Sequence, residues 1–327
     1  MNQEEVVLEA AAQRGAAGER GLALVTIVRT TGSVPRHPPS KMLVSVDGSL
    51  VGTIGGGKVE LEVVALALKV AAGQAPAQKL EKHLVRDLAM CCGGAVELWV
   101  EPLDGARWKA LAEALRRRRA RRASALVTEL PTGDRPGAKE LLDGHDVLAT
   151  RRARLEDGRF VEPVLPNARL VLFGAGHVAH AVAPLALNVG FEVVVCDEEE
   201  SFASEARFPG VQLLHSFDAK ECARELGGWD ADDHVIVLTR DHAIDQTLIE
   251  ALLPSASSVA YLGLIGSRGK VERFRKRLEG KPDWDADAWA KLHAPVGLAI
   301  GAEDPEEIAL AIVGDLVKTR AARRGAR

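Results

Sequence analysis

Two adjacent cysteines, Cys91 and Cys92, are the residues of this sequence whose types and spacing are best suited to chemistry. They are two of the chain's four cysteines, and Gly93 and Gly94 follow them directly in the stretch AMCCGGAVEL. Thiolates are soft ligands, and backbone amides close to a thiol favour its ionised form. Zinc usually takes four ligands in C-x-x-C pairs, whereas the next cysteine is Cys196, and a disulfide between neighbours is strained. The residues alone leave two hypotheses open, a ligating or reactive thiol and a buried, inert pair.

Three consecutive glycines, Gly55, Gly56 and Gly57, precede a predicted helix in the stretch GTIGGGKVE. A loop of this kind exposes backbone N–H groups that can bind an anion. It does not match a P-loop, because Lys58 is followed by Val59 instead of serine or threonine. The alternative is a loop that needs glycine because another part of the backbone packs against it.

A second glycine turn, with the spacing G-x-G-x-x-A, lies in the stretch ARLVLFGAGHVAHAVAPLALNVGFEVVVCDEEE. It follows an apolar strand, opens a helix and precedes a second strand that ends at Asp197, which is the context of a dinucleotide-binding fold. We expect Gly174 to form the tight turn, Gly176 to let a phosphate approach the backbone, and Ala179 to let the helix pack on the sheet. Asp197 is suited to a ribose diol. The alternative is a Rossmann fold that binds no dinucleotide.

Further polar residues occur at the turn and after later strands of the same half. His177 lies inside the glycine turn, His242 follows a strand in LTRDHAIDQ, and Ser267 and Arg268 follow another strand in GLIGSRGK. Open parallel sheets bind ligands where their strands end, so all four are candidate binding residues. Arg268 and Lys270 form a basic pair suited to a phosphate or a pterin-type anion. Ser267 can alternatively serve as a helix N-cap alone.

The elements that position these motifs follow from periodicity and turn residues. In residues 1–166 they predict helices and strands in mixed order, including a helix over EEVVLEAAAQRG and a hairpin around Asp47-Gly48. After Pro166-Asn167, short apolar strands alternate with helices, which is the pattern of a parallel sheet covered on both faces. We therefore predict an α/β protein with an N-terminal mixed α/β domain, 1–166, and a C-terminal Rossmann-like parallel-sheet domain, 167–327.

Composition narrows the classes of function. A length of 327 residues with 47% hydrophobic residues suits two domains. The net charge of −4, from 42 basic and 46 acidic residues, argues against a nucleic-acid partner. The basic run LRRRRARRAS is expected to be the solvated end of a helix, with an acidic or phosphate ligand as the alternative. No apolar stretch reaches the ~18 residues of a membrane span and the N-terminus is acidic, so we expect no membrane partner and a cytoplasmic location.

Taken together, these motifs resemble the XdhC/CoxI family of accessory proteins of molybdenum hydroxylases, and within it the XdhC branch. In the N-terminal half the resemblance is carried by TIVRTTGSVPRHPPSKMLVSVDGSLVGTIGGGKVE and CCGGAVELWVEPL. In the C-terminal half it is carried by LVLFGAGHVAHAVAPLALNVGFEVVVCDEEESF, VLTRDHAIDQTLI, GLIGSRGK and HAPVGLAIGAEDPEEIALAI. The resemblance covers most of the chain.

The resemblance implies a chaperone more than a catalyst. Such a protein binds the molybdenum cofactor (molybdopterin), guards it while a cysteine desulfurase installs the sulfido ligand, and delivers it to the molybdenum subunit of xanthine dehydrogenase or a related hydroxylase. Relatives of the CoxI type often carry Ser-Gly-Gly-Cys-Val-Glu, where this chain has Lys58 in the place of the cysteine. Any thiol role therefore falls on Cys91 and Cys92, both expected near the cofactor as molybdenum or sulfur contacts, with one of them essential. The paired domains also suggest a homodimer.

Two other classes of function stay open from the residues. An NAD-dependent oxidoreductase would use the second glycine turn and Asp197, and it would need a proton donor such as His242 or His293, neither of which the spacing selects. A sulfurtransferase-like enzyme would carry a persulfide on Cys91 or Cys92. Binding of NAD or another nucleotide by the Rossmann-like half is thus a separate expectation.

Overall fold

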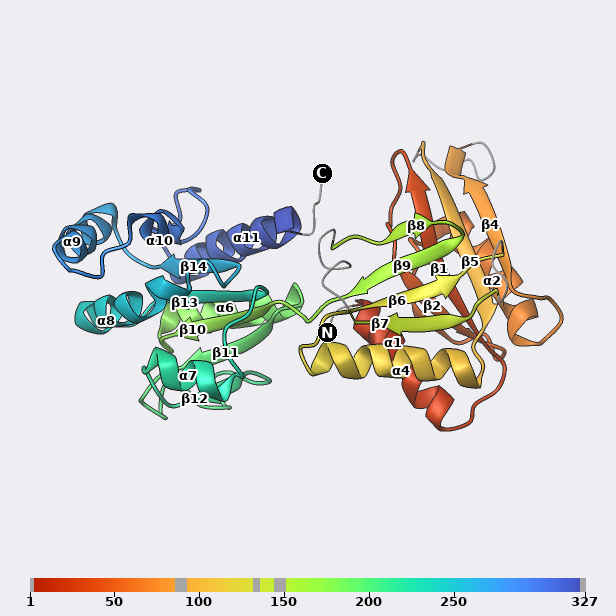
Figure 1. Ribbon diagram of the computed structural model, residues 1–327, viewed down its shortest axis with the longest axis horizontal. Coiled ribbons are helices and arrows are strands. Elements are labelled where there is room, and N and C mark those ends of the chain that lie inside the picture. The colour runs from red at the N-terminus through yellow and green to blue at the C-terminus, as the bar shows by residue number, and fades with distance from the viewer. Residues whose placement is uncertain (1–2, 86–92, 132–135, 144–150, 324–327) are drawn as a thin grey trace. The chain divides into compact units, whose positions relative to one another are not determined.

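The computed structural model describes residues 3–85, 93–131, 136–143 and 151–323 of the chain. The chain divides into two compact units, Met1–Pro166 and Asn167–Arg327, and each has its own sheets and its own hydrophobic core (Figure 1). Cys91 and Cys92 lie outside the described residues. Their surroundings are therefore approached from Gly93 and from the loops that contact it.

The first unit is built around a five-stranded antiparallel sheet with the order β3-β2-β1-β5-β4. The predicted hairpin is present, because β2 and β3 pair on either side of Asp47-Gly48, and Gly48 has the positive φ of 86° that tight hairpin turns require. The strands are β1 (Leu22–Thr31), β2 (Lys41–Ser45), β3 (Leu50–Gly52), β4 (Gln78–His83) and β5 (Ala95–Pro102).

A smaller antiparallel sheet with the order β7-β6-β9-β8 and helices on two sides complete the described part of this unit. Helix α2 packs its valines on one face of the five-stranded sheet, whereas α1 and α4 pack their apolar residues on leucines of the other face. Helix α1 is the one predicted over EEVVLEAAAQRG. The elements are α1 (Gln3–Ala16), α2 (Gly57–Ala71), α4 (Gly105–Arg119), β6 (Ser124–Glu129), β7 (Lys139–Leu142), β8 (Arg154–Glu156) and β9 (Arg159–Val164).

The second unit contains a six-stranded sheet in which every pair of neighbours is parallel, with the order β12-β11-β10-β13-β14-β15. In chain order this is 3-2-1-4-5-6, the order of a Rossmann fold, and the prediction of a Rossmann-like parallel sheet is confirmed. The strand order reverses between β10 and β13. The strands are β10 (Arg169–Phe173), β11 (Glu192–Cys196), β12 (Gln212–Leu214), β13 (Asp233–Val237), β14 (Tyr261–Leu264) and β15 (Leu292–His293).

Helices cover both faces of this sheet (Figure 1). Helices α6 and α11 pack on one face, and α7, α8, α9 and α10 pack on the other. No helix within the described residues is long and apolar enough to cross a membrane. The helices are α6 (His177–Asn188), α7 (Ala219–Glu225), α8 (His242–Leu252), the 3-10 helix η1 (Leu253–Ser255), α9 (Arg268–Glu279), α10 (Ala286–Ala290) and α11 (Pro305–Arg323).

Candidate functional site

Three loops of the first unit converge at one end of the five-stranded sheet. They are 31–40 after β1, 53–57 before α2 and 93–94 before β5, and they carry motifs singled out in the sequence. The first two touch each other, because a Cβ on Gly55 would lie 2.7 Å from Cγ of Pro35. A side chain at position 55 would therefore collide with the ring of Pro35, a side-chain contact instead of the backbone contact that the second hypothesis for this loop expected.

The third loop is fixed to the first by its backbone. The N–H of Gly94 donates to the carbonyl oxygen of Ser33 at 3.0 Å, and the N–H of Leu84 donates to the carbonyl oxygen of Gly94 at 2.9 Å. A Cβ on Gly94 would lie 2.4 Å from the oxygen of Thr31, and one on Gly32 would lie 3.0 Å from Cα of Gly94. The backbone that follows the cysteine pair is thus held firmly, and we call this meeting of the three loops the glycine junction.

The glycine junction also has open space and positive charge. Gly93 is exposed, and a Cβ added there or on Gly56 would meet no atom of the described residues within 4 Å. Arg36 is exposed in the 31–40 loop, and Lys58 is exposed in the first turn of α2. A bulky anion could approach the chain directly beside the cysteine pair, and these two cations would attract it.

A carboxylate from helix α2 accepts hydrogen bonds from backbone N–H groups of the 53–57 loop. Oε2 of Glu60 accepts hydrogen bonds from Oγ1 of Thr53 at 2.5 Å, from the N–H of Ile54 at 3.0 Å and from the N–H of Gly56 at 3.1 Å. Partial burial raises the pKa of Glu60, but these hydrogen bonds outweigh it and hold the pKa below its usual value of 4.5. The chain thus supplies its own anion to this loop, which the sequence analysis missed. Cofactor binding by Gly55, Gly56 and Gly57 stays a prediction.

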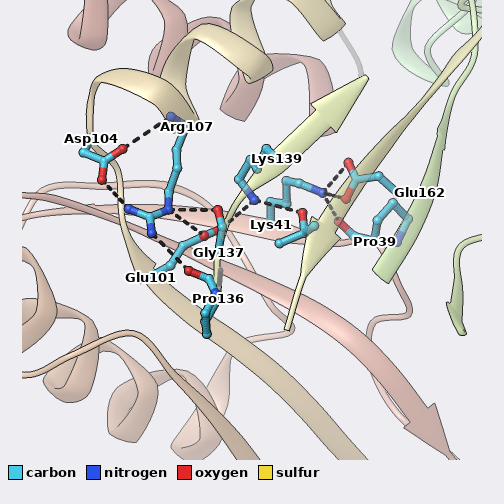
Figure 2. A network of polar contacts seen from close by, with 10 residues as sticks. Pro39, Lys41, Glu101, Asp104, Arg107, Pro136, Gly137, Lys139 and Glu162 are labelled. Carbon is cyan, nitrogen blue, oxygen red and sulfur yellow. Dashed lines mark hydrogen bonds and ion pairs between the residues drawn. The ribbon is translucent and has the colours of Figure 1, made fainter. Parts of the chain in front are cut away.

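A buried ion pair between Lys41 and Glu162 is hydrogen-bonded to the backbone of the 31–40 loop (Figure 2). Nζ of Lys41 lies 2.7 and 2.6 Å from the two carboxylate oxygens of Glu162 on β9, and it donates to the carbonyl oxygen of Pro39 at 3.2 Å. Both charged side chains are almost inaccessible, at 1% and 2% exposure. Burial raises the pKa of Glu162, and the Lys41 charge opposes that effect. Lys41 therefore connects the proline loop to the smaller sheet.

A second buried carboxylate, Glu101 on β5, lies in the same network (Figure 2). Its oxygens are 2.6 Å from Nζ of Lys139 and 3.3 Å from Nε of Arg107. Lys139 also donates to Oγ1 of Thr128 at 3.0 Å, and Arg107 donates to the carbonyl oxygen of Gly137 at 3.0 Å. The network is internal to the unit, and its contacts indicate a structural role.

In the second unit, the candidate residues gather at the edge where the parallel strands end. The register aligns Phe173 with Cys196 and Val237, and Val237 with Leu264, so β10, β11, β13 and β14 end at one level. The turns that follow these strands carry the predicted residues. The structure thus brings one set to a common edge: Gly174, Gly176, His177, Asp197, His242, Ser267 and Arg268.

The glycine turn after β10 has the tight geometry predicted for it. Gly174 has φ of 119°, and a Cβ there would lie 2.6 Å from the carbonyl oxygen of Leu238 on the neighbouring turn. Gly176 is the N-cap of α6, makes no side-chain cap, and has open space around it. His177 is exposed at the start of the helix, whereas Ala179 is fully buried against the sheet. The turn thus leaves the beginning of α6 exposed, and ligand binding there stays a prediction.

Asp197 is buried and already hydrogen-bonded. One carboxylate oxygen accepts from the N–H of Ala175 at 2.9 Å, and the other accepts from the N–H of Glu199 at 3.1 Å. Nη2 of Arg240 lies 3.9 Å from Oδ1 of Asp197 and 3.1 Å from Oε2 of Glu199. The guanidinium carbon of Arg240 lies over the ring of Phe202, 3.9 Å from the ring centroid. Asp197 therefore organises the glycine turn. Its predicted contact with a ribose stays a prediction.

The turns after β13 and β14 are joined by a buried lysine. Nζ of Lys270 donates to the Asp245 carboxylate and, at 2.9 Å, to the carbonyl oxygen of Ile265. Asp245 also accepts from Thr239, at 3.0 Å from its N–H and 2.7 Å from its hydroxyl. The expected basic pair is therefore split, because Arg268 is exposed and Lys270 is buried.

Of the remaining polar candidates, Ser267 is a helix N-cap, whereas His242 is not a cap and His293 lies on β15. Ser267 accepts from the N–H of Lys270 at 3.3 Å as the N-cap of α9, and His242 is exposed at the start of α8. The ring of His293 stacks on Tyr261, the first residue of β14, at 3.9 Å, and burial lowers the pKa of His293. Among the described residues, no group of three or more His, Cys, Asp or Glu side chains could hold a metal ion.

Two family models match the chain. Residues 170–316 match the XdhC Rossmann domain, and residues 15–82 match the XdhC and CoxI family. The first match covers the parallel sheet, and the second covers the two loops 31–40 and 53–57 of the glycine junction.

Similar proteins of known name span nearly the whole chain. YqeB of Escherichia coli K12 is 30% identical over 91% of this chain, which corresponds to 43% of the length of that relative. A Bacillus subtilis protein named as a probable subunit of xanthine dehydrogenase is 27% identical over 91% of this chain and 92% of its own length. The molybdenum cofactor insertion chaperone PaoD of Escherichia coli K12 is 26% identical, over 92% of this chain and 84% of its own length.

A solved structure is similar over almost the entire length. It is described as a xanthine dehydrogenase from Bacillus halodurans, and it shares 27% identity and a TM-score of 0.79. The alignment covers 99% of this chain and 97% of the other.

Proposed function

The chain belongs to the XdhC and CoxI family, and on that premise we propose that it binds the molybdenum cofactor and acts in the maturation of a molybdenum hydroxylase. The observation that carries this proposal is the glycine junction, where three loops fix the backbone beside the cysteine pair and leave open space at Gly93. A relative of similar length is a molybdenum cofactor insertion chaperone, which supports the same role.

The residues at the junction suit this cargo. Cys91 and Cys92 would provide soft sulfur ligands, and the exposed Arg36 and Lys58 would attract its negative charge. When bound, the cofactor brings a molybdenum centre and a pterin phosphate, and the chain's own residues hold and shield it. One cysteine is expected to be essential for binding.

The edge of the parallel sheet is a separate anion site in this proposal. Gly176, His177 and Arg268 would contact a phosphate, either of the pterin or of a nucleotide such as NAD. Asp197 keeps the glycine turn in shape for that contact through its hydrogen bond to Ala175. Nucleotide binding is supported by the strand order and the turn geometry.

The finer steps of the role are part of the same proposal. We propose that the protein works in the cytoplasm as a homodimer, and that it protects the cofactor while a cysteine desulfurase adds the terminal sulfur. It then delivers the cofactor to xanthine dehydrogenase or a related molybdenum hydroxylase. Protection and delivery require binding and release, so the protein is a chaperone in this proposal and not a catalyst.

The test is to purify the protein in the presence of a molybdenum cofactor source and to measure bound pterin and bound NAD. The native chain, Cys91→Ala and Cys92→Ala are compared, with Cys222→Ala in the second unit as the matched control. We expect pterin on the native chain and on the control, and its loss from one of the first two variants. Full pterin binding by both variants would remove the cysteines from the site. NAD-dependent turnover without pterin binding would overturn the chaperone role in favour of an oxidoreductase.

A further inference from the structure

Three turns at the carboxyl edge of the parallel sheet are tied to one another, with the glycine turn in the middle. Strand β10 lies between β11 and β13, so the turn that follows β10 lies between the other two. On one side, Asp197 accepts from the N–H of Ala175 at 2.9 Å. On the other side, a Cβ on Gly174 would lie 2.6 Å from the carbonyl oxygen of Leu238. The residues that follow Asp197 and Leu238 therefore flank the place where α6 begins.

An ion pair joins the two outer turns. Nη2 of Arg240, two residues after Leu238, donates to Oε2 of Glu199 at 3.1 Å. Glu199 lies two residues after Asp197, and its other carboxylate oxygen accepts from the hydroxyl of Ser201 at 3.1 Å. The side chains of Glu199 and Arg240 are 55% and 53% exposed, whereas that of Asp197 is 3% exposed. On this side of the glycine turn, a ligand therefore meets the ion pair more readily than Asp197.

Asp197 was expected to contact a ribose, but its carboxylate already serves the backbone. One oxygen accepts from the N–H of Ala175, and the other accepts from the N–H of Glu199. The Glu199 carboxylate offers the same acceptor chemistry on an accessible side chain. A ribose hydroxyl on this side of the turn would thus donate to Glu199 instead of Asp197.

The guanidinium of Arg240 is held by an aromatic ring as well as by the carboxylate. Its central carbon lies 3.9 Å from the centroid of the Phe202 ring. A guanidinium can stack on an aromatic face while its N–H groups remain available as donors. The side chain would therefore stay at the turn if the Glu199 charge were removed. Its released donors would then suit a phosphate, which arginine binds in a bidentate manner.

We propose that Glu199 and Arg240 select the nucleotide that binds at the glycine turn, an inference that rests on the nucleotide binding proposed above. The selected class is a dinucleotide whose adenosine ribose has a free 2′-hydroxyl, as in NAD. This hydroxyl donates to the Glu199 carboxylate. A ribose 2′-phosphate, as in NADP, is rejected because Glu199 repels its charge and already engages the Arg240 donors.

The experiment measures the dissociation constants of NADH and NADPH, which differ only in the 2′-phosphate, from nucleotide fluorescence on the full chain. We expect the native chain to bind NADH about tenfold more tightly than NADPH. Glu199→Gln should tighten NADPH binding about tenfold, because it removes the repulsion and releases Arg240. Glu200→Gln is the matched control, since it removes an exposed carboxylate one residue later, leaves the ion pair in place and should keep the native preference.

A double variant tests the role of Arg240. When Arg240→Met is combined with Glu199→Gln, NADPH binding should be about tenfold weaker than in Glu199→Gln alone. Circular dichroism checks that all variants are folded. A gain in NADPH affinity that survives in the double variant would overturn the assignment of Arg240 as the phosphate ligand.

Other outcomes separate this inference from the proposal on which it rests. Equal affinity of the native chain for the two nucleotides, or NADPH binding that Glu199→Gln leaves unchanged, would overturn the selection by Glu199. Failure of the native chain to bind either nucleotide would overturn the inference together with the nucleotide site. Pterin bound to the same samples would then show that the molybdenum cofactor role stands without it.

Discussion

The two glycine turns open their helices in similar ways but satisfy their backbone differently. Gly56 is the N-cap of α2 and Gly176 is the N-cap of α6, and neither helix has a side-chain cap. In the first turn, Glu60 reaches back from the helix and accepts from the N–H of Gly56 itself. In the second turn, the carboxylate of Asp197 accepts from the N–H of Ala175, the residue before the N-cap Gly176. The start of α6 is therefore left facing outward, beside an exposed histidine.

This difference shows that a glycine run alone does not identify a ligand site. An anion-binding loop is available to a ligand only when the chain does not supply an anion of its own. By that criterion the second turn is suited to a phosphate, and the first turn is suited to holding the glycine junction in place. Four experiments test this comparison, and they are ordered by the size of the expected effect.

The largest effect is expected for Lys41→Met, which removes the buried cation that holds the 31–40 loop, the loop that packs on the first turn at Gly55. The Glu162 carboxylate would be left buried without a partner, and the carbonyl oxygen of Pro39 would lose its donor. We expect the free energy of unfolding to fall by about 3–5 kcal/mol, measured by denaturant titration. Lys79→Met is the matched control, because Lys79 also pairs with a glutamate but is 41% exposed, and it should cost no more than about 1 kcal/mol. Equal losses from both variants would show that the buried pair gives the 31–40 loop no special support.

The next effect tests the close packing of the second turn. Gly174→Ala places a Cβ 2.6 Å from the carbonyl oxygen of Leu238 at a φ of 119°. We expect a loss of about 3 kcal/mol in the free energy of unfolding, because overpacking and an unfavourable φ add. Gly210 also has a positive φ, of 74°, but no neighbouring atom that a Cβ would meet among the described residues. Gly210→Ala therefore measures the cost of the positive φ alone, about 1 kcal/mol in the free energy of unfolding. A loss for Gly174→Ala no larger than that of the control would mean that the neighbouring turn yields to the methyl group.

A smaller effect comes from the two N-cap glycines compared with each other. Gly56→Ala and Gly176→Ala both enter open space and both change a glycine N-cap to alanine, so these contributions cancel in the comparison. The backbone differs, because Gly56 has φ of 73° with ψ of −170°, whereas Gly176 has φ of −73°. We expect Gly56→Ala to lower the free energy of unfolding by about 2 kcal/mol more than Gly176→Ala does. Thermal and denaturant unfolding of the two variants measure the difference, and equal losses would show that the first turn relaxes to accept a side chain.

Much of the scaffold could be predicted from the sequence because it depends on local pattern. The runs LVLFG, EVVVCD, VQLL, HVIVLT and VAYLGLIG correspond to β10, β11, β12, β13 and β14, and the glycine turn has the tight geometry that its spacing predicts. In each case a short continuous apolar run or a required glycine conformation is visible within a few residues. The common edge then follows from the parallel order of the strands.

The charged interior could not be predicted, because it depends on contacts between distant residues. Lys41 and Glu162 are 121 positions apart, and nothing in either neighbourhood marks the side chain as buried. Arg118 belongs to a run expected to be a solvated helix end, yet it is only 4% exposed and donates to the carbonyl oxygen of Leu165 at 3.0 Å. Glu60 lies in the quoted motif GTIGGGKVE. Its hydrogen bonds to the loop backbone depend on the positive φ angles of Gly55, Gly56 and Gly57. Three glycines allow those angles but do not by themselves determine them.

The smallest effect, and the most direct test of the comparison, is Glu60→Gln. The amide oxygen of glutamine can still accept from Ile54 and Gly56, so only the contribution of the charge is lost, about 1 kcal/mol at neutral pH. Because the pKa of Glu60 is lowered in the folded state, its carboxylate stabilises the protein above the unfolded pKa of 4.5, and this contribution is lost as the pH falls through the folded pKa. The difference between native chain and variant should therefore shrink toward zero in acid. Glu62→Gln, on the exposed side of the same helix turn, should show a smaller and less pH-dependent change. If Glu60→Gln leaves stability unchanged at neutral pH, the first turn does not depend on its internal anion, and the distinction between the two turns fails.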